Sequence, residues 1–293
     1  MTLSKSKSCL TVLALAFGML LAACVSPSAA QKTLSAEESR ARLRVAEAMF
    51  GERCKTAGEK FYRTAENVEG IFLMKIRPAG INYRDQFRMD DPYGRDLGGD
   101  GYLESFLRGS YEANRSGIPI PGSPEPPKGY LYVEAVDPKD GNRYRYTAAR
   151  KVVGKQDATA RNVQIQLKSD PNYDLNIYAF VLDKISALGP TPRYGITYDD
   201  ISTREEREYW IAGSSLKVID LQTNEVMAER IGYMIDRGQG DTGGGRSPWL
   251  MAADYACPSF QRNPLRPPGN GAAAQVRQTQ YFTEKALKPR LEY

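Results

Sequence analysis

The amino-acid sequence predicts an α+β fold, a meandering antiparallel sheet with helices near both ends of the chain. Three observations carry this prediction. An amphipathic helical pattern follows Ser35, several strand-like segments separated by turn sequences lie between residues 130 and 235, and a second helix start lies at Ser247-Pro248. We expect these elements to form one domain over residues 35–293.

The composition excludes several kinds of chemistry. The chain has 293 residues, 26% of them charged and 41% hydrophobic, which is typical of an ordinary globular domain. It contains no histidine, so a Ser-His-Asp triad, a Cys-His dyad and a histidine-ligated zinc site are all excluded. We therefore predict no catalytic residues of these kinds, no metal site and no cofactor.

The first 23 residues are distinct from the rest of the chain. Lys5 and Lys7 precede an uncharged stretch from Cys9 to Ala23. A helix needs about 20 apolar residues to cross a bilayer, and this stretch is shorter than that. A positive start followed by a short apolar run predicts a signal peptide over residues 1–23.

The apolar run ends in the sequence Leu21-Ala22-Ala23-Cys24. These four residues match the lipobox, so the start of the chain resembles a bacterial lipoprotein precursor. The resemblance implies that Cys24 becomes the mature N-terminus and carries acyl chains that hold the protein on a membrane. An ordinary secretory signal, cut near Ala23 or Ala30, is the alternative.

The residue after the lipobox cysteine predicts which membrane holds the protein. In lipoproteins an aspartate there favours the inner membrane, whereas this chain has Val25. The resemblance therefore implies the outer membrane, with the domain facing the periplasm. Residues 24–34 are mostly small or polar, which predicts a flexible tether.

The cysteines that remain after processing predict a disulfide. Cys9 leaves with the signal peptide and Cys24 is acylated, so Cys54 and Cys257 are left in an oxidising compartment, where thiols pair. A Cys54–Cys257 bond would close a loop of about 200 residues, worth about 5 kcal/mol in the chain-entropy model. It would link the N-terminal helix to a short C-terminal helix.

The N-terminal helix has a clear start. Ser35 and Glu38 have the spacing of a capping box. One helical face then carries Leu43, Ala46, Phe50, Cys54, Ala57 and Phe61. We interpret this stripe as the docking face of a helix that runs to about residue 61.

Between this helix and the sheet, the sequence predicts a strand and two loops. Residues 70–76 are apolar and strand-like, and residues 90–101 form a loop whose aspartates lack the spacing of a calcium site. Residues 117–129 hold five prolines and are expected to be extended. We interpret this segment as a connector between two subdomains, with a partner-binding strap as the alternative.

The sheet is predicted from seven strand-like segments. In several of them β-branched or aromatic residues alternate, and turn sequences such as the one around Asn224 separate them. The predicted strands cover residues 130–136, 143–152, 162–167, 175–182, 209–213, 216–221 and 226–235. After them Ser247 and Pro248 predict a short helix that ends at Cys257, and we expect a last helix within residues 272–288.

A glycine-rich segment is the first candidate for chemistry. Residues 237–246 hold five glycines between Arg237 and Arg246, and they lead into the helix start at Ser247. Helix N-termini favour anions, so Arg237, Arg246 and Ser247 form a candidate ligand site for a small anion. The segment lacks the known phosphate-loop motifs, and a hairpin-to-helix loop explains it equally well.

Carboxylates between residues 199 and 208 are the second candidate. Two carboxylates at the right separation would serve a hydrolase of envelope polymers. Arg204 and Arg207 interleave with them, which favours a locally ion-paired loop. The pattern Ser214-x-x-Lys217 resembles the Ser-Lys motif of penicillin-binding enzymes, but we expect a strand there instead of the helix that the motif opens.

The function that these observations favour is binding. We expect a lipid-anchored envelope protein that acts as an accessory or protective partner of another envelope protein, without enzymatic activity. A carboxylate-based hydrolase and an anion binder are the alternatives. The 40 basic residues fall to 38 without Lys5 and Lys7, against 35 acidic ones, so we predict no nucleic-acid partner.

Overall fold

The computed structural model describes residues 35–78, 87, 98–108, 129–260 and 278–290, and it has the predicted α+β class. Its helices are α1 (Ala36–Cys54), α2 (Asp100–Arg108), α3 (Arg161–Ser169), α4 (Arg204–Glu208), α5 (Pro248–Ala252) and α7 (Gln278–Ala286). Its strands are β1 (Gly58–Phe61), β2 (Ala65–Val68), β3 (Gly70–Leu73), β4 (Tyr132–Val136), β5 (Arg143–Lys155), β6 (Asn176–Ser186), β7 (Tyr194–Asp200), β8 (Ile211–Asp220), β9 (Glu225–Ile235), β10 (Ala256–Cys257) and β11 (Leu287–Pro289).

One large and mostly antiparallel sheet runs through the molecule. Its strand order is β1-β9-β8-β7-β3-β4-β5-β6, and β10 also pairs with β9. Two antiparallel meanders, β4-β5-β6 and β7-β8-β9, are joined by β3, which pairs in parallel with both β4 and β7. The short strands β2 and β11 form a second, parallel pair. The predicted meander is therefore present, but a strand from earlier in the chain joins its two halves.

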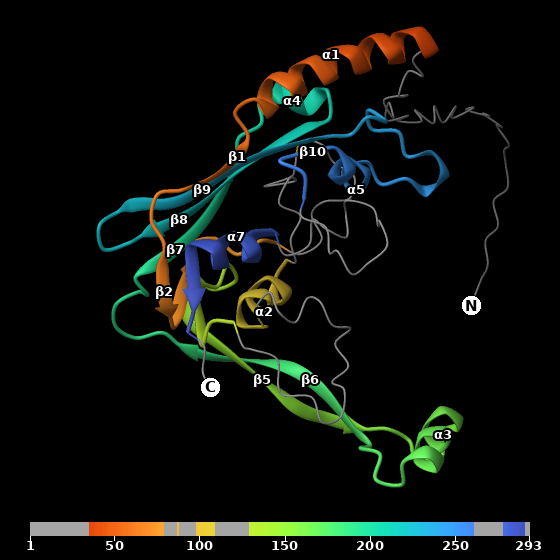
Figure 1. Cartoon of the computed structure of the whole chain (residues 1–293), viewed down its shortest axis with the longest axis vertical. Coiled ribbons are helices and arrows are strands. Elements are labelled where there is room, and N and C mark those ends of the chain that lie inside the picture. The colour runs from red at the N-terminus through yellow and green to blue at the C-terminus, as the bar shows by residue number, and fades with distance from the viewer. Residues whose placement is uncertain (1–34, 79–86, 88–97, 109–128, 261–277, 291–293) are drawn as a thin grey trace, which may run out of the picture.

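The helices lie on both faces of this sheet (Figure 1). On one face, α2 and α7 pack on alternate residues of β3, β4, β7 and β8 and form the largest apolar cluster with them. On the other face, α1 contacts β9 and α4 contacts β8. The arm formed by β5 and β6 carries α3 at its tip and extends away from this body, as Figure 1 shows.

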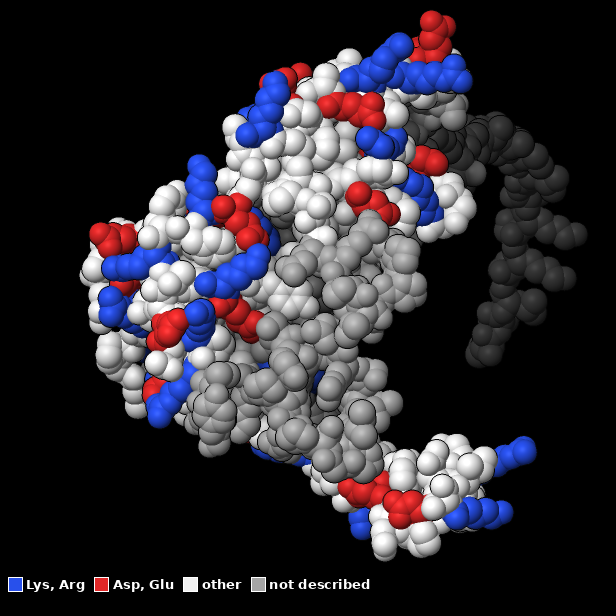
Figure 2. Space-filling model, viewed as in Figure 1, with Lys and Arg blue, Asp and Glu red and all other residues white. Residues whose placement is uncertain are grey.

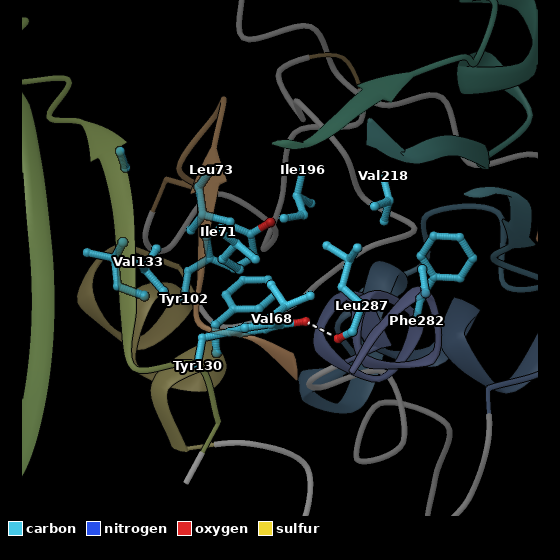
Figure 3. Packing of buried hydrophobic residues seen from close by; sticks show 14 of the residues in the cluster. Val68, Ile71, Leu73, Tyr102, Tyr130, Val133, Ile196, Val218, Phe282 and Leu287 are labelled. Atoms are coloured by element: carbon cyan, nitrogen blue, oxygen red, sulfur yellow. Dashed lines mark hydrogen bonds between the residues drawn. The ribbon is translucent and has the colours of Figure 1, made fainter. Parts of the chain in front are cut away.

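The centre of the core is a set of apolar side chains around Tyr130 (Figure 3). Ile71 and Val133 pair in register across β3 and β4, and both are fully buried. The buried hydroxyl of Tyr130 donates a hydrogen bond of 2.6 Å to the carbonyl of Leu287, drawn as the dashed line in Figure 3. Burial raises the pKa of Tyr130, so the group stays a neutral donor. This bond ties the C-terminal strand β11 to the core.

The first helix begins as the sequence predicts and ends earlier. Ser35 and Glu38 form both hydrogen bonds of a capping box, and Ala46 is fully buried on the predicted face. However, α1 ends at Cys54, and the predicted extension to Phe61 is wrong, because residues 58–61 pair with β9 as strand β1. The helical spacing of Phe61 is outweighed by its pairing in the sheet.

The segment 162–167 is the second correction. We expected a strand there, but it lies within helix α3. Val163, Ile165 and Leu167 alternate as strand residues do, yet β5 and β6 already pair with each other along this arm. The segment does not add to the outer edge of either strand. It connects β5 to β6 as a helix that buries Val163.

Two further boundaries differ from the prediction. Residues 209–213 and 216–221 belong largely to one continuous strand, β8. The predicted helix over 248–257 is shorter, because α5 ends at Ala252, and after a 3-10 turn over residues 253–255 Cys257 lies in strand β10. The proline-rich residues 117–128 and the loop residues 90–97 lie outside the described residues.

Candidate functional site

The cysteine pair, the glycine-rich loop and the carboxylates over residues 199–208 lie together at one end of the molecule, whereas Cys24 and the rest of residues 1–34 lie outside the described residues. We call this end of the molecule the stapled end, and it comprises α1, residues 199–210 and residues 233–257. The disulfide between Cys54 and Cys257 is present, with a Cα–Cα distance of 5.6 Å across a sequence separation of 203 residues. It fastens the last residue of α1 to strand β10, at the edge of the large sheet.

An ion pair holds α1 against the short helix α4. Thr203 and Glu206 form a second capping box, and the amide of Thr203 donates to the Glu206 carboxylate at 2.6 Å. The other oxygen of this buried carboxylate accepts from the guanidinium of Arg53 on α1. This hydrogen bond raises the pKa of Arg53. The Thr203-x-x-Glu206 spacing is visible in the sequence and would have located α4.

Arg207 joins α4 to the aromatic residues of the stapled end. Its buried guanidinium pairs with Asp200 and lies 5.6 Å from the ring centroid of Trp249. Trp249 is fully buried and lies 5.1 Å from the ring centroid of Trp210. Both tryptophans belong to one apolar cluster with α5, and they have the core role that such residues usually have.

Asp236 organises the glycine-rich loop over residues 237–246. Its fully buried carboxylate accepts hydrogen bonds from the amides of Gly238 at 3.0 Å and Gly240 at 2.8 Å. Both of its oxygens also accept from the guanidinium of Arg246, which raises the pKa of that arginine. Asp236 is not predicted from the sequence, because a single aspartate at the end of a strand carries no local signal.

Two glycines of this loop have no room for a side chain. A Cβ at Gly240 would lie 2.3 Å from the indole of Trp210, and its φ of +86° lies in the left-handed region. A Cβ at Gly238 would lie 2.5 Å from the guanidinium of Arg246. These glycines therefore let the loop close tightly over Asp236 and the tryptophans.

The two arginines of the predicted anion site have ionic partners within the fold. Arg246 pairs with Asp236, and Arg237 pairs with Glu47 of α1 at 3.1 Å while its guanidinium lies 4.2 Å from the ring centroid of Tyr255. Ser247 precedes α5, and its side chain makes no capping hydrogen bond there. The two positive charges are thus matched by carboxylates of the same end of the molecule.

Four of the five carboxylates between residues 199 and 208 have a cationic partner. Asp199 pairs with Lys75 at 2.5 Å and Glu208 pairs with Arg204 at 3.5 Å, while Asp200 and Glu206 pair as described above. Glu205 is exposed. The segment is therefore the ion-paired one that the interleaved arginines indicate, although residues 204–208 form a helix rather than a loop.

Ser214 and Lys217 both lie in strand β8, as expected from the sequence around them. They are three residues apart, so their side chains point to opposite faces of the sheet. The Nζ of Lys217 lies 3.6 Å from the Oε1 of Glu229 on the neighbouring strand β9. The Ser-Lys pattern therefore does not assemble into one site.

Two buried carboxylates outside the stapled end also went unnoticed in the sequence. Asp220 is fully buried and accepts from Arg193 at 2.8 Å and from Arg63 at 2.6 Å, and its pKa is lowered chiefly by the hydrogen bonds from Arg193. Glu134 is fully buried and accepts from Arg145 at 2.8 and 2.9 Å. Glu134 meets its partner across the hairpin of β4 and β5, and Asp220 meets partners that are 27 and 157 residues away, so no short motif reveals either carboxylate.

Within the part of the chain that the structure describes, no three His, Cys, Asp or Glu side chains are grouped so as to hold a metal ion. None of the described helices is both long enough and apolar enough to span a bilayer. No protein-family model, curated protein or solved structure is significantly similar to this chain.

Proposed function

We propose that this chain is a lipid-anchored protein of the bacterial cell envelope that binds another envelope protein as an accessory or protective partner. It is attached through acyl chains on Cys24 to the outer membrane and faces the periplasm. The observation that carries this proposal is the sequence Leu21-Ala22-Ala23-Cys24, placed directly after the uncharged run that ends the signal peptide.

The disulfide supports the exported location. A bond between Cys54 and Cys257 persists in oxidising compartments such as the periplasm and is rare in the cytosol. The thiols come from opposite ends of the domain and meet in the folded chain. A reducing compartment would leave this link unmade.

The charge pairing at the stapled end supports binding over catalysis. General acid and base groups need a pKa close to the working pH and access to a substrate. The buried carboxylates of Glu206 and Asp236 are both held by arginines within the fold. Both carboxylates are buried and occupied by these partners, which leaves neither of them open to a substrate.

The anchoring is tested by the Cys24→Ser variant of the full chain. Mass analysis of the N-terminal peptide should find a lipidated Cys24 in the unchanged protein, and the Cys24→Ser variant should leave the membrane fraction. Cys9→Ser is the matched control, because Cys9 lies in the signal peptide, and it should still be acylated. An unmodified Cys24, or intact residues 1–23 in the cytosol, would contradict the proposal.

The binding role is tested by purifying the tagged, acylated protein from membranes. We expect a stoichiometric envelope protein to purify with it. The purified protein is also incubated with cell-wall fragments. Turnover of these fragments without a protein partner would contradict the binding role and favour the hydrolase.

A further inference from the structure

The tip of the β5–β6 arm exposes apolar side chains all around it. We define the arm tip as residues 152–178. Val152, Val153 and Ile165 are each exposed by more than half, at 52%, 55% and 59%. Ile177 and Tyr178 are also exposed, at 44% and 39%. An isolated exposed apolar residue needs no explanation, but a group of five at the end of a projecting arm does.

These side chains point in several directions. Val152 and Tyr178 are direct partners across β5 and β6 and share one face of the ribbon. Ile177 points to the opposite face, because neighbouring strand residues alternate. Ile165 lies on α3, beyond the end of the ribbon. A pocket in a protein partner would cover one face, whereas a membrane interface surrounds such a tip on every side.

The charges of the arm tip add a second argument. Lys155, Arg161 and Lys168 are exposed, and none of them has an ion pair with another residue that the structure describes. The acidic side chains are used locally instead, since Asp157, Asp170 and Asp174 each accept a turn amide at 2.8 or 2.9 Å. The arm tip therefore holds three positive and three negative side chains. Its aspartates are held against the backbone of the turns, whereas its three long basic side chains are free to reach the headgroups of anionic lipids.

The arm tip also lies on the same side of the molecule as the start of α1. Figure 1 shows the first turn of α1 and helix α3 at opposite ends of the long axis, both on the right-hand side of the view. Figure 2 shows Lys and Arg side chains projecting from the outer end of the arm on that side. Ser35 is eleven residues on from Cys24. Such a tether reaches about 40 Å at most, so α1 must start within about 40 Å of the membrane that holds Cys24.

We propose that the arm tip is a second membrane contact, in which the apolar side chains around α3 enter the interface of the same bilayer that holds Cys24, and Lys155, Arg161 and Lys168 bind its anionic headgroups. This inference rests on the proposed function, because the acyl chains define the membrane. With two separated contacts, the protein lies along the membrane instead of rotating about its tether, and the opposite side of the sheet faces the periplasm.

The test places a fluorescent reporter at the tip. The native tryptophans, Trp210 and Trp249, are buried, so an added tryptophan at Ile165 reports its own surroundings. The acylated full chain carrying Ile165→Trp is reconstituted into vesicles of phosphatidylethanolamine and phosphatidylglycerol, with and without brominated acyl chains. We expect bromine to quench at least half of the fluorescence that the substitution adds.

Leu188→Trp is the matched control. Leu188 is 86% exposed, but it follows the end of β6 that is far from α3. Its added fluorescence should not be quenched, although the protein is held by the same acyl chains. The triple variant Lys155→Glu, Arg161→Glu, Lys168→Glu in the Ile165→Trp chain should lose most of the quenching, and so should omission of phosphatidylglycerol.

The outcomes separate the two proposals. If Cys24 is acylated and Ile165→Trp is no more quenched than Leu188→Trp, the arm contact is wrong and the anchor stands. Crosslinking of residue 165 to a protein, without quenching, would likewise overturn the membrane contact in favour of a protein partner. If mass analysis finds Cys24 unmodified, the proposed function itself fails.

Discussion

Arg246 donates to both carboxylate oxygens of Asp236 across the glycine-rich loop, while the amides of Gly238 and Gly240 donate to the same carboxylate. Asp236 is fully buried at the end of β9. A buried carboxylate is tolerated only when its hydrogen bonds and its charge are both satisfied. The loop that looked like an anion site in the sequence is therefore folded around an anion of its own.

This pairing predicts how far the stability of the fold falls when Arg246 is removed. Arg246→Ala leaves a buried aspartate with two amide donors and no cation, so it should lower the free energy of unfolding by about 3 kcal/mol, at the lower end of the range for broken buried pairs. Urea denaturation measures it. Arg237→Ala is the control, because the half-exposed pair with Glu47 is worth about 1 kcal/mol at most.

A second substitution checks the cause. Adding Asp236→Asn to Arg246→Ala removes the unpaired charge and should restore part of the lost stability, which gives a favourable coupling in a double-mutant cycle. Purely additive losses would show that the charge pairing is not what holds the loop.

Because Cys54 and Cys257 form one bond, we expect the effects of replacing each of them on stability not to add. Cys54→Ser should lower the free energy of unfolding by about 2–5 kcal/mol, because the unfolded chain regains the freedom of a loop of 203 residues. Cys257→Ser should have a closely similar effect, and the double variant should be no worse than either single one. Denaturation under non-reducing conditions measures all three, and reductant should affect only the unchanged protein.

Because Gly240 lies against Trp210, we expect a single added methyl group at this position to destabilise the protein. In Gly240→Ala the added methyl group would clash with the indole of Trp210, and the alanine would have to adopt a left-handed backbone conformation. The substitution should therefore lower the free energy of unfolding by about 1–3 kcal/mol. Gly51→Ala is the control. Gly51 lies in α1 with nothing within 4 Å of its Cβ position, so alanine there should add up to about 1 kcal/mol of stability. Thermal unfolding followed by circular dichroism compares the two variants.

Asp220 predicts how stability depends on acid. Arg193 and Arg63 lower its pKa in the folded protein below the ordinary value of 3.8. Its contribution is therefore complete above about pH 4 and is lost as the pH falls through the lower folded pKa. The Asp220→Asn variant should show a flatter loss of stability below pH 4, measured by urea midpoints at successive pH values. Arg193→Gln, which removes the largest cause of the shift, should flatten the profile in the same direction, and an unchanged slope in both would refute this account.

Local signals explain which helices could be predicted. The capping box of Ser35 and Glu38 involves residues three apart, so the sequence contains both partners of each bond. The same is true of Thr203 and Glu206, whose spacing would have identified α4. The error at α3 has the opposite origin. The alternation of Val163, Ile165 and Leu167 is typical of a strand, but the segment connects β5 to β6 as a helix that buries Val163.

The disulfide of the candidate site could be predicted from the sequence, whereas its ion pairs could not. Cys54 and Cys257 are the only cysteines left after the signal and the lipobox, so counting alone identifies the pair. Glu206 with Arg53 could not be found in this way, because 153 residues separate them and many other arginines could have been the partner.

The sequence by itself determined the signals that depend on neighbours along the chain: the helix start at Ser35, the turn at Asn224, the cysteine pair and the lipobox that predicts an anchor. The tertiary structure alone decided that β3 joins two meanders, that α3 closes an exposed arm tip, and that Asp236 and Arg246 face each other beneath a loop. The hydrogen bonds of a capping box or a turn join residues that are only a few positions apart, so the sequence contains both partners. Strand order and buried charge pairs form only when segments far apart in the chain bury their apolar surfaces against one another.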